Sequence, residues 1–127
     1  MEHVAIGVIL RGDKVLISRR EKSSHQGGLW EFPGGKKEGE ESIRQTLSRE
    51  LAEELGIKAI NSNSIFSVLY DYTEKIVKLD FFLIKNFSGE PFGVEGQIIK
   101  WECVNSLNPS NFPKANYSII EWLKNRI

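Results

Sequence analysis

Three carboxylates stand close together in the chain, at Glu50, Glu53 and Glu54, and they follow a glycine-rich turn, Phe32-Pro33-Gly34-Gly35. Like charges at this density raise each other's pKa unless a cation neutralises them. Hard divalent cations prefer oxygen ligands of this kind. The residue types and their spacing therefore predict a site for a divalent metal ion.

These carboxylates belong to a predicted helix. Apolar residues recur every four positions and form one stripe: Ile43, Leu47, Leu51 and Leu55. At about 100° per residue, Glu50 and Glu54 fall at the edge of this stripe rather than opposite it. A solvated acidic face, the alternative reading, does not require carboxylates beside the core. The helix is therefore expected to present them to a site at the edge of the core.

The ends of this helix can be predicted as well. The segment Gly39-Glu40-Glu41-Ser42 is expected to open it, with acidic residues where the helix dipole favours them, and Gly56 is expected to cap its end. Arg49 can pair with Glu53 one turn later and offset one charge, but not all three. Glu41 projects away from the stripe, so it is expected to support the site rather than to bind the ion.

The remaining elements follow from alternating apolar residues and turn residues. Strands are predicted over Val4–Leu10 and Lys14–Arg19, which form a hairpin, and over Trp30–Phe32, Ile65–Tyr72, Ile76–Lys85 and Ile98–Val104. Loops are predicted over Glu21–Gly28, Asn61–Ser64 and Phe87–Gln97, and a final helix runs from Ala115 or Asn116 to Arg126 with Asn116 as its N-cap. Strands outnumber helices and two helices flank them, which predicts an α+β fold or a mixed sheet sandwiched between helices.

Composition narrows the class of protein. A chain of 127 residues suits one domain over 1–127. Seventeen basic and seventeen acidic residues give no basic field for a nucleic-acid polymer. The apolar run Val4–Leu10 is too short to span a membrane, and Met1-Glu2-His3 lacks the basic start of a signal peptide. With a single cysteine, Cys103, these features predict a cytoplasmic protein.

The acidic helix and the glycine before it resemble a known signature. The pattern is Gly, five residues, Glu, seven residues, then Arg-Glu-apolar-x-Glu-Glu-x-Gly-apolar. The chain fits every fixed position: Gly35, Glu41, Arg49, Glu50, Leu51, Glu53, Glu54, Gly56 and Ile57. This is similar to the signature box of the Nudix hydrolases. The resemblance implies the Nudix fold, a mixed β-sheet sandwiched between α-helices, and hydrolysis of a nucleoside diphosphate linked to another group.

Other segments resemble one branch of that family, the MutT-like 8-oxo-dGTP diphosphatases. They are Ser18–Arg20, Leu29–Lys36, Gly89–Pro91, Glu95–Gln97 and Phe112–Asn116. This branch removes an oxidised nucleotide from the precursor pool and so prevents mutation during DNA replication. Asn116 favours the MutT-like branch over a related branch that acts on CTP, because that branch carries a different residue at this position.

The resemblance also implies roles for the acidic residues. Glu50, Glu53 and Glu54 would hold Mg²⁺ or Mn²⁺, with the Gly35 carbonyl as another ligand. Glu95 would be a further ligand or the general base. Glu95, Glu50 and Glu53 all remain candidates for that base.

A second set of residues is expected to bind the substrate, a nucleoside triphosphate. Lys36 would lie near the phosphates, Arg20 and Phe32 would line the nucleotide pocket, and the backbone of Phe32, Pro33 and Gly34 would bond the base. Asn116 would accept a hydrogen bond from N7–H of 8-oxoguanine while it donates to O6. Ordinary guanine has no hydrogen on N7, so such a site discriminates strongly. The alternative is that Asn116 only caps the helix.

The sequence is compatible with three functions. The leading one is a metal-dependent 8-oxo-dGTP diphosphatase that works as a monomer on a small-molecule substrate. The second is a less selective pyrophosphatase that acts on CTP or another nucleotide. The third, a non-catalytic binding module, is disfavoured because such modules usually lose carboxylates of the box, and here all are present.

Overall fold

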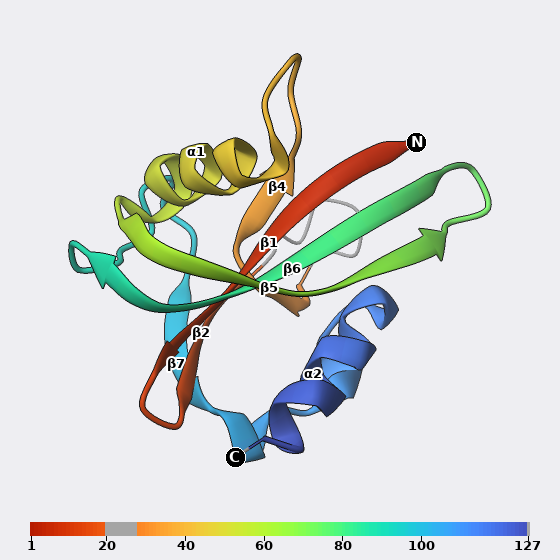
Figure 1. Cartoon of the computed structure of the whole chain (residues 1–127). Helices are drawn as coiled ribbons and strands as arrows, with labels where there is room; N and C mark the ends of the chain where they lie inside the picture. The colour runs from red at the N-terminus through yellow and green to blue at the C-terminus, as the bar shows by residue number, and fades with distance from the viewer. Residues whose placement is uncertain (20–27, 127) are drawn as a thin grey trace.

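The computed structural model describes residues 1–19 and 28–126. In this part of the chain, seven strands form one sheet that lies between two helices, α1 and α2 (Figure 1). The strands are β1 (Glu2–Arg11), β2 (Lys14–Arg19), β3 (Trp30–Glu31), β4 (Gly34–Lys36), β5 (Lys58–Asp71), β6 (Ile76–Ser88) and β7 (Ile99–Cys103). The helices are α1 (Ile43–Leu55) and α2 (Tyr117–Lys124), and short 3₁₀ turns cover Val104–Ser106, Pro109–Asn111 and Lys114–Asn116. The predicted α+β class is confirmed.

Strand β1 is the centre of the sheet. It runs parallel to β6, from the pair Glu2–Val77 to the pair Ile9–Ile84, and antiparallel to β2 and β4. Strand β5 extends the sheet beyond β6, whereas β3 and β7 both pair with β2. The combination of parallel and antiparallel pairs makes this a mixed sheet, as predicted.

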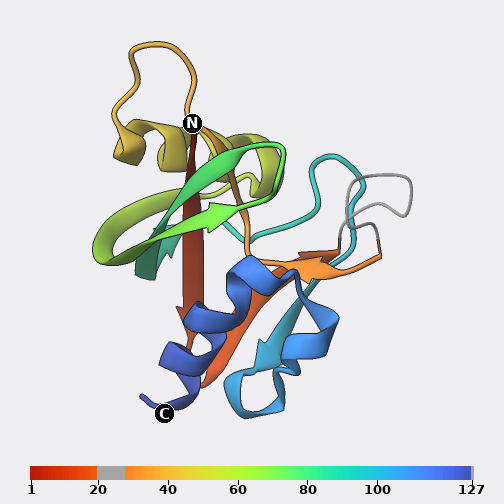
Figure 2. The same ribbon diagram turned by 90° about the vertical axis from the view of Figure 1, so that its right-hand side faces the viewer.

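Strand β1 also divides the core into two layers, because its side chains alternate between the two faces. Ala5 and Ile9 pack toward α1, whereas Ile6 and Val8 pack toward α2. The α1 layer also contains Leu16, Leu47, Leu51, Leu55, Ile57, Phe82 and Ile84. The α2 layer also contains Val15, Ile17, Phe32, Val77, Leu79, Phe81, Val104, Leu107, Phe112, Ala115, Ile119, Ile120 and Leu123. Two views at right angles show the helices on opposite sides of β1 (Figure 2).

One loop prediction is wrong, and another begins too early. Asn61–Ser64 lies within β5, and β6 continues through Phe87 to Ser88. The backbone pairing of β5 with β6 tolerates these polar residues because β5 is an edge strand. Its register shifts between Ala59 and Asn61, between Asn61 and Asn63, and between Ser64 and Phe66.

Other boundaries differ by a few residues. Helix α2 begins at Tyr117 and ends at Lys124, shorter than predicted, after a 3₁₀ turn over Lys114–Asn116. Of the predicted loop 21–28, only Gly28 belongs to the described residues. Over residues 1–19 and 28–126, no helix is long and apolar enough to cross a membrane.

Candidate active site

Helix α1 is fixed at both ends. Ser42 Oγ accepts a hydrogen bond from the Gln45 N–H at 3.1 Å, and the Gln45 side chain accepts one from the Ser42 N–H at 2.8 Å. This capping box opens the helix, so the expectation of acidic residues in its first turn is wrong. Gly56 ends the helix with a left-handed φ of 68°, and its N–H bonds to the Ala52 carbonyl.

Strand β4 brings the glycine turn against α1 (Figure 1). Gly34 and Gly35 pair with Ile6 and Ala5 of β1. A Cβ at Gly34 would lie 2.0 Å from the Ala5 carbonyl oxygen, and a Cβ at Gly35 would lie 2.2 Å from Glu50 Cδ. The Glu50 carboxylate thus occupies the space that any side chain at position 35 would fill.

Glu54 is the carboxyl group that most needs a positive partner. Burial raises its pKa to about 8, and the negative charges of Glu50, Glu31 and Glu95 act in the same direction. A backbone hydrogen bond from Gly34 opposes these effects without cancelling them. Burial also raises the pKa of Glu50. A cation placed here would remove both penalties.

Arg49 neutralises part of this charge. Its guanidinium bonds Glu41 at 2.6 Å and Glu50 at 2.9 Å, and it forms the predicted pair with Glu53 at 3.3 Å. The hydrogen bond from Arg49 lowers the pKa of Glu41 to about 2. Over the described residues, no hydrogen bond or ion pair joins Arg49 to Glu54, so Arg49 does not pair with the most strongly perturbed carboxyl.

The oxygen atoms of the predicted ligands suit a hard divalent cation, but the carboxylates do not yet point toward one common position. Among the described residues, no three His, Cys, Asp or Glu side chains are grouped so that they could hold an ion. Glu50 is bound to Arg49, and the Glu53 side chain is 57% exposed. Because the Glu53 side chain is exposed, packing does not confine it to one rotamer. The carboxylates and the neighbouring Gly35 carbonyl are the oxygen donors that such ions prefer.

Two further carboxylates act on this cluster from other elements. Glu95, which was predicted, lies in the loop between β6 and β7, whose Val94 N–H bonds the Glu54 carbonyl at 3.1 Å. Glu31 ends β3 and was not predicted, although its negative charge raises the pKa of Glu54. Its position directly before the Phe-Pro-Gly-Gly turn is the signal that sequence reasoning could have used.

Two of the residues predicted to bind the nucleotide, Phe32 and Asn116, lie on the α2 side. Phe32 is only 3% exposed and stacks on Phe112 with ring centroids 5.4 Å apart, so it belongs to the core. Pro33 is buried, and its carbonyl accepts a hydrogen bond from the Gly7 N–H at 2.8 Å. Asn116 is 7% exposed and occupies the N-cap position of α2, but its side chain makes no capping hydrogen bond. The predicted capping role of this side chain is therefore wrong.

Of the two predicted cations, the structure describes only Lys36, and its ammonium is not brought to the carboxylates. The Lys36 ammonium lies 3.2 Å from Glu2, and only the Lys36 carbonyl takes part in the Arg49 network. Arg20 lies outside the described residues. The structure thus gathers Gly35, Glu50 and Glu54 around the end of β4 and leaves Lys36 at an exposed edge.

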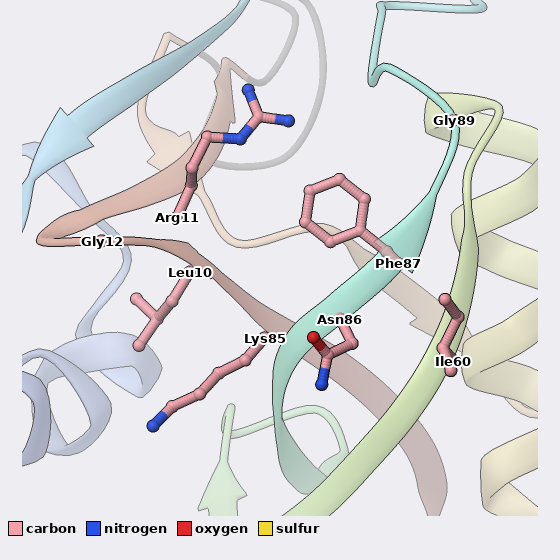
Figure 3. A pocket seen from close by; sticks show the side chains of 8 residues that line it. All are labelled: Leu10, Arg11, Gly12, Ile60, Lys85, Asn86, Phe87 and Gly89. Atoms are coloured by element: carbon pink, nitrogen blue, oxygen red, sulfur yellow. The ribbon is translucent and has the colours of Figure 1, made fainter.

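A cavity of about 690 Å³ opens elsewhere, between the ends of β1, β5 and β6 (Figure 3). It is lined by Leu10, Arg11, Gly12, Ile60, Lys85, Asn86, Phe87 and Gly89. None of these residues belongs to the predicted site, and none carries a carboxylate. Its lining carries two cationic side chains, Arg11 and Lys85, and no carboxylate, so we place the candidate metal site at the carboxylates of α1.

Comparison with known proteins identifies the family to which the chain belongs. A family model described as the NUDIX domain matches residues 5–122. An 8-oxo-dGTP diphosphatase of Buchnera aphidicola subsp. Schizaphis graminum is 37% identical over 125 residues, covering 98% of this chain and 95% of its own. A CTP pyrophosphohydrolase of Escherichia coli is 40% identical over 101 residues, covering 80% of this chain and 75% of its own.

Solved structures agree on the fold. A structure from a study of MutT from Aliivibrio salmonicida and Vibrio cholerae superposes with a TM-score of 0.85 at 32% identity, covering 99% of this chain and 98% of its own. The chain belongs to the Nudix hydrolases. Within them it is a MutT-like nucleotide pyrophosphohydrolase, from a family that generally requires a divalent metal ion.

Proposed function

We propose that this protein hydrolyses 8-oxo-dGTP to 8-oxo-dGMP and pyrophosphate, which removes an oxidised precursor before it enters DNA. The observation that carries the chemical part of this proposal is the Glu54 carboxyl, buried beside Glu50 with its pKa raised to about 8. Such a group binds a cation strongly because the ion removes both the burial penalty and the repulsion. The relatives named 8-oxo-dGTP diphosphatase support the choice of substrate.

The proposed metal ligands are the carboxylates of Glu50, Glu53 and Glu54 and the carbonyl of Gly35, with Mg²⁺ or Mn²⁺ as the ion. When bound, such an ion neutralises phosphate charge and acidifies water. Arg49 holds Glu50 through its 2.9 Å hydrogen bond and restricts its rotamers. Glu41 in turn holds Arg49, as expected of a supporting residue.

The proposed reaction is attack of water on the β-phosphorus. The new bond joins the water oxygen to that phosphorus, and the bond to the oxygen bridging the α- and β-phosphates breaks. The nucleoside monophosphate leaves with the bridging oxygen, and the other product is pyrophosphate. A carboxylate of the site takes the proton of the water, and Glu95, Glu50 and Glu53 are the candidates. Measuring the pH dependence of kcat in variants of each residue distinguishes them.

Recognition of the base is proposed for Asn116, at the start of α2. Asn116 is buried, and its amide is not used to cap the helix. It is proposed to accept from N7–H of 8-oxoguanine and to donate to O6. Phe32, Pro33 and Gly34 are proposed to support the base, and Arg20 and Lys36 to bind other parts of the nucleotide.

A second candidate function is hydrolysis of CTP, which the similarity to the CTP pyrophosphohydrolase supports. The test is kcat/KM for 8-oxo-dGTP, dGTP and CTP in the presence of Mg²⁺. We expect 8-oxo-dGTP to exceed dGTP by on the order of 10² or more, the scale at which a mismatched buried polar group discriminates. A ratio near one would remove the 8-oxo-dGTP assignment, and a preference for CTP would establish the alternative.

The remaining parts of the proposal concern the protein's setting. We place the activity in the cytoplasm, because a reducing compartment fits the single Cys103, which is a free thiol. The protein is proposed to act as a monomer with a single domain over 1–127. Light scattering at micromolar concentration tests the monomer, which predicts a mass near 14.5 kDa.

A further inference from the structure

The loop that carries Glu95 is attached to the C-terminal end of α1, beside the proposed metal ligand Glu54 (Figure 1). The Val94 N–H bonds the Glu54 carbonyl at 3.1 Å, and the Phe92 N–H bonds the Leu55 carbonyl at 3.2 Å. The last carbonyls of a helix have no partner within the helix. The loop supplies two of these partners, so its position is tied to that of α1.

One side chain completes this attachment. Gln97 donates from Nε2 to the Glu54 carbonyl at 2.9 Å, and its Oε1 accepts from the Glu95 N–H at 3.0 Å. A single amide therefore connects the backbone of the proposed ligand on the helix to the backbone of the proposed ligand or base on the loop. We call these two hydrogen bonds the Gln97 bridge.

The loop is wound tightly around this amide. The Gly96 N–H bonds the Gly93 carbonyl at 3.0 Å, and Gly96 has a left-handed φ of 81°. A Cβ at Gly93 would lie 2.1 Å from the Gln97 carbonyl oxygen. Glycine at both positions lets the chain turn back so that the Gln97 side chain reaches Glu54 and Glu95 together.

We propose that Gln97 is a positioning residue, which holds Glu95 at a fixed distance from Glu54 so that the Glu95 carboxylate faces the reacting water or the ion. This inference rests on the proposed function of Glu95. Both hydrogen bonds of the Gln97 side chain go to backbone groups, of Glu54 and Glu95, so its effect on the reaction is expected to pass through Glu95. Loss of the Gln97 side chain is expected to lower kcat and to leave KM unchanged within about twofold, because the ground-state contacts of the nucleotide remain.

The first test needs neither metal nor substrate. Gln97→Met keeps the length of the side chain and removes both hydrogen bonds of the Gln97 bridge. Hydrogen exchange followed by NMR is expected to show the Glu95 amide exchanging about fivefold faster in this variant, the effect of one lost hydrogen bond. In Gln97→Glu a carboxylate oxygen can still accept from the Glu95 N–H, so that amide stays protected. If the Glu95 amide exchanged at the wild-type rate in Gln97→Met, the hydrogen bond from this amide to Gln97 would be refuted.

The second test is a double-mutant cycle with the best substrate of the nucleotide panel. Gln97→Met is expected to lower kcat by about ten- to a hundredfold, the cost of displacing a reacting group by a fraction of an ångström to 1 Å. If Gln97 acts through Glu95, adding Gln97→Met to Glu95→Gln lowers kcat no further. Additive losses, or a loss in KM instead of kcat, would refute the positioning role.

A matched control tests whether the loss of any side-chain hydrogen bond within a loop lowers kcat. Asn108 also accepts hydrogen bonds within a loop, from the Ser110 N–H at 3.0 Å and its hydroxyl at 2.8 Å, away from the carboxylates. Asn108→Ala is expected to keep wild-type kcat. Failure of the wild type on every nucleotide would refute the proposed function, and the exchange measurement would still decide the bridge. Full kcat in Glu95→Gln would overturn the role of Glu95, and with it the positioning role of Gln97.

Discussion

Replacing Gly35 by alanine should lower the activity of the protein and leave its folding stability nearly unchanged. The added Cβ would lie 2.2 Å from Glu50 Cδ, whereas ordinary contact begins at 3.4 Å. The Glu50 carboxylate must therefore move by about 1.2 Å, because the backbone of β4 is held by its pairing with β1. Displacement on this scale costs about 10² in rate, or about 2.7 kcal/mol of transition-state stabilisation.

The fold should survive this change because the atoms that must move are the end of a flexible side chain. Gly34→Ala is the matched comparison, since its Cβ would lie 2.0 Å from the backbone oxygen of Ala5, which cannot move without breaking the sheet. Gly12→Ala is the control for glycine replacement itself. That glycine has a φ of 64° and no atom within 4 Å of the added Cβ, so the change should cost only about 1 kcal/mol of backbone strain.

The assay combines kcat/KM with thermal unfolding. We expect Gly35→Ala to lose activity with nearly wild-type unfolding, Gly34→Ala to lose the folded state, and Gly12→Ala to keep activity. Wild-type turnover in Gly35→Ala would show that the position of the Glu50 carboxylate does not matter to the reaction. An equal loss of folding in Gly35→Ala and Gly34→Ala would show that the glycine serves the sheet alone.

Three other residues give separate predictions. Glu53→Gln should lower kcat by about 10³ through loss of a charge that stabilises the transition state, and near-normal turnover would refute its role as a ligand. Asn116→Ala should lower the preference for 8-oxo-dGTP over dGTP by on the order of 10², yet it should not lower the melting temperature as loss of a helix cap does, because the side chain does not cap α2. Glu41 has a pKa lowered to about 2 by Arg49, so its contribution to stability is present above pH 4.5 and is lost as the pH falls toward 2. Acid titration of Glu41→Gln should show a smaller fall in melting temperature over that range, and an unchanged fall would contradict this.

The elements that the sequence predicts well are those fixed by local patterns. The stripe of α1 and its glycine cap follow from spacing, and the hairpin of β1 and β2 follows from two apolar runs around a short turn. The sequence predicts strand β5 only from Ile65 onward, because the polar residues Asn61–Ser64 resemble a loop although an edge strand accepts them. Local polarity does not reveal pairing with a distant strand.

Some contacts of the candidate site can likewise be predicted from local sequence patterns, and others cannot. Glu50 and Glu54 could be placed together from helical geometry, because one turn of α1 relates them. The effect of Glu31 on Glu54 and the bonds of Gln97 depend on how β3 and the loop after β6 fold back on α1. Such contacts join residues far apart in the chain, and one sequence contains no pattern that measures those distances.

Calorimetric titration of Mn²⁺ at pH 7 in buffers of different ionisation enthalpy tests the metal site most directly. Glu54 is protonated at this pH when its pKa is about 8, so uptake of the ion must release a proton from it. We predict that binding of the ion at pH 7 releases a proton, and that Glu54→Gln loses both the proton release and most of the affinity. Absence of Mn²⁺ binding, or binding with the same heat in every buffer, would contradict the assignment of this carboxyl group as a metal ligand.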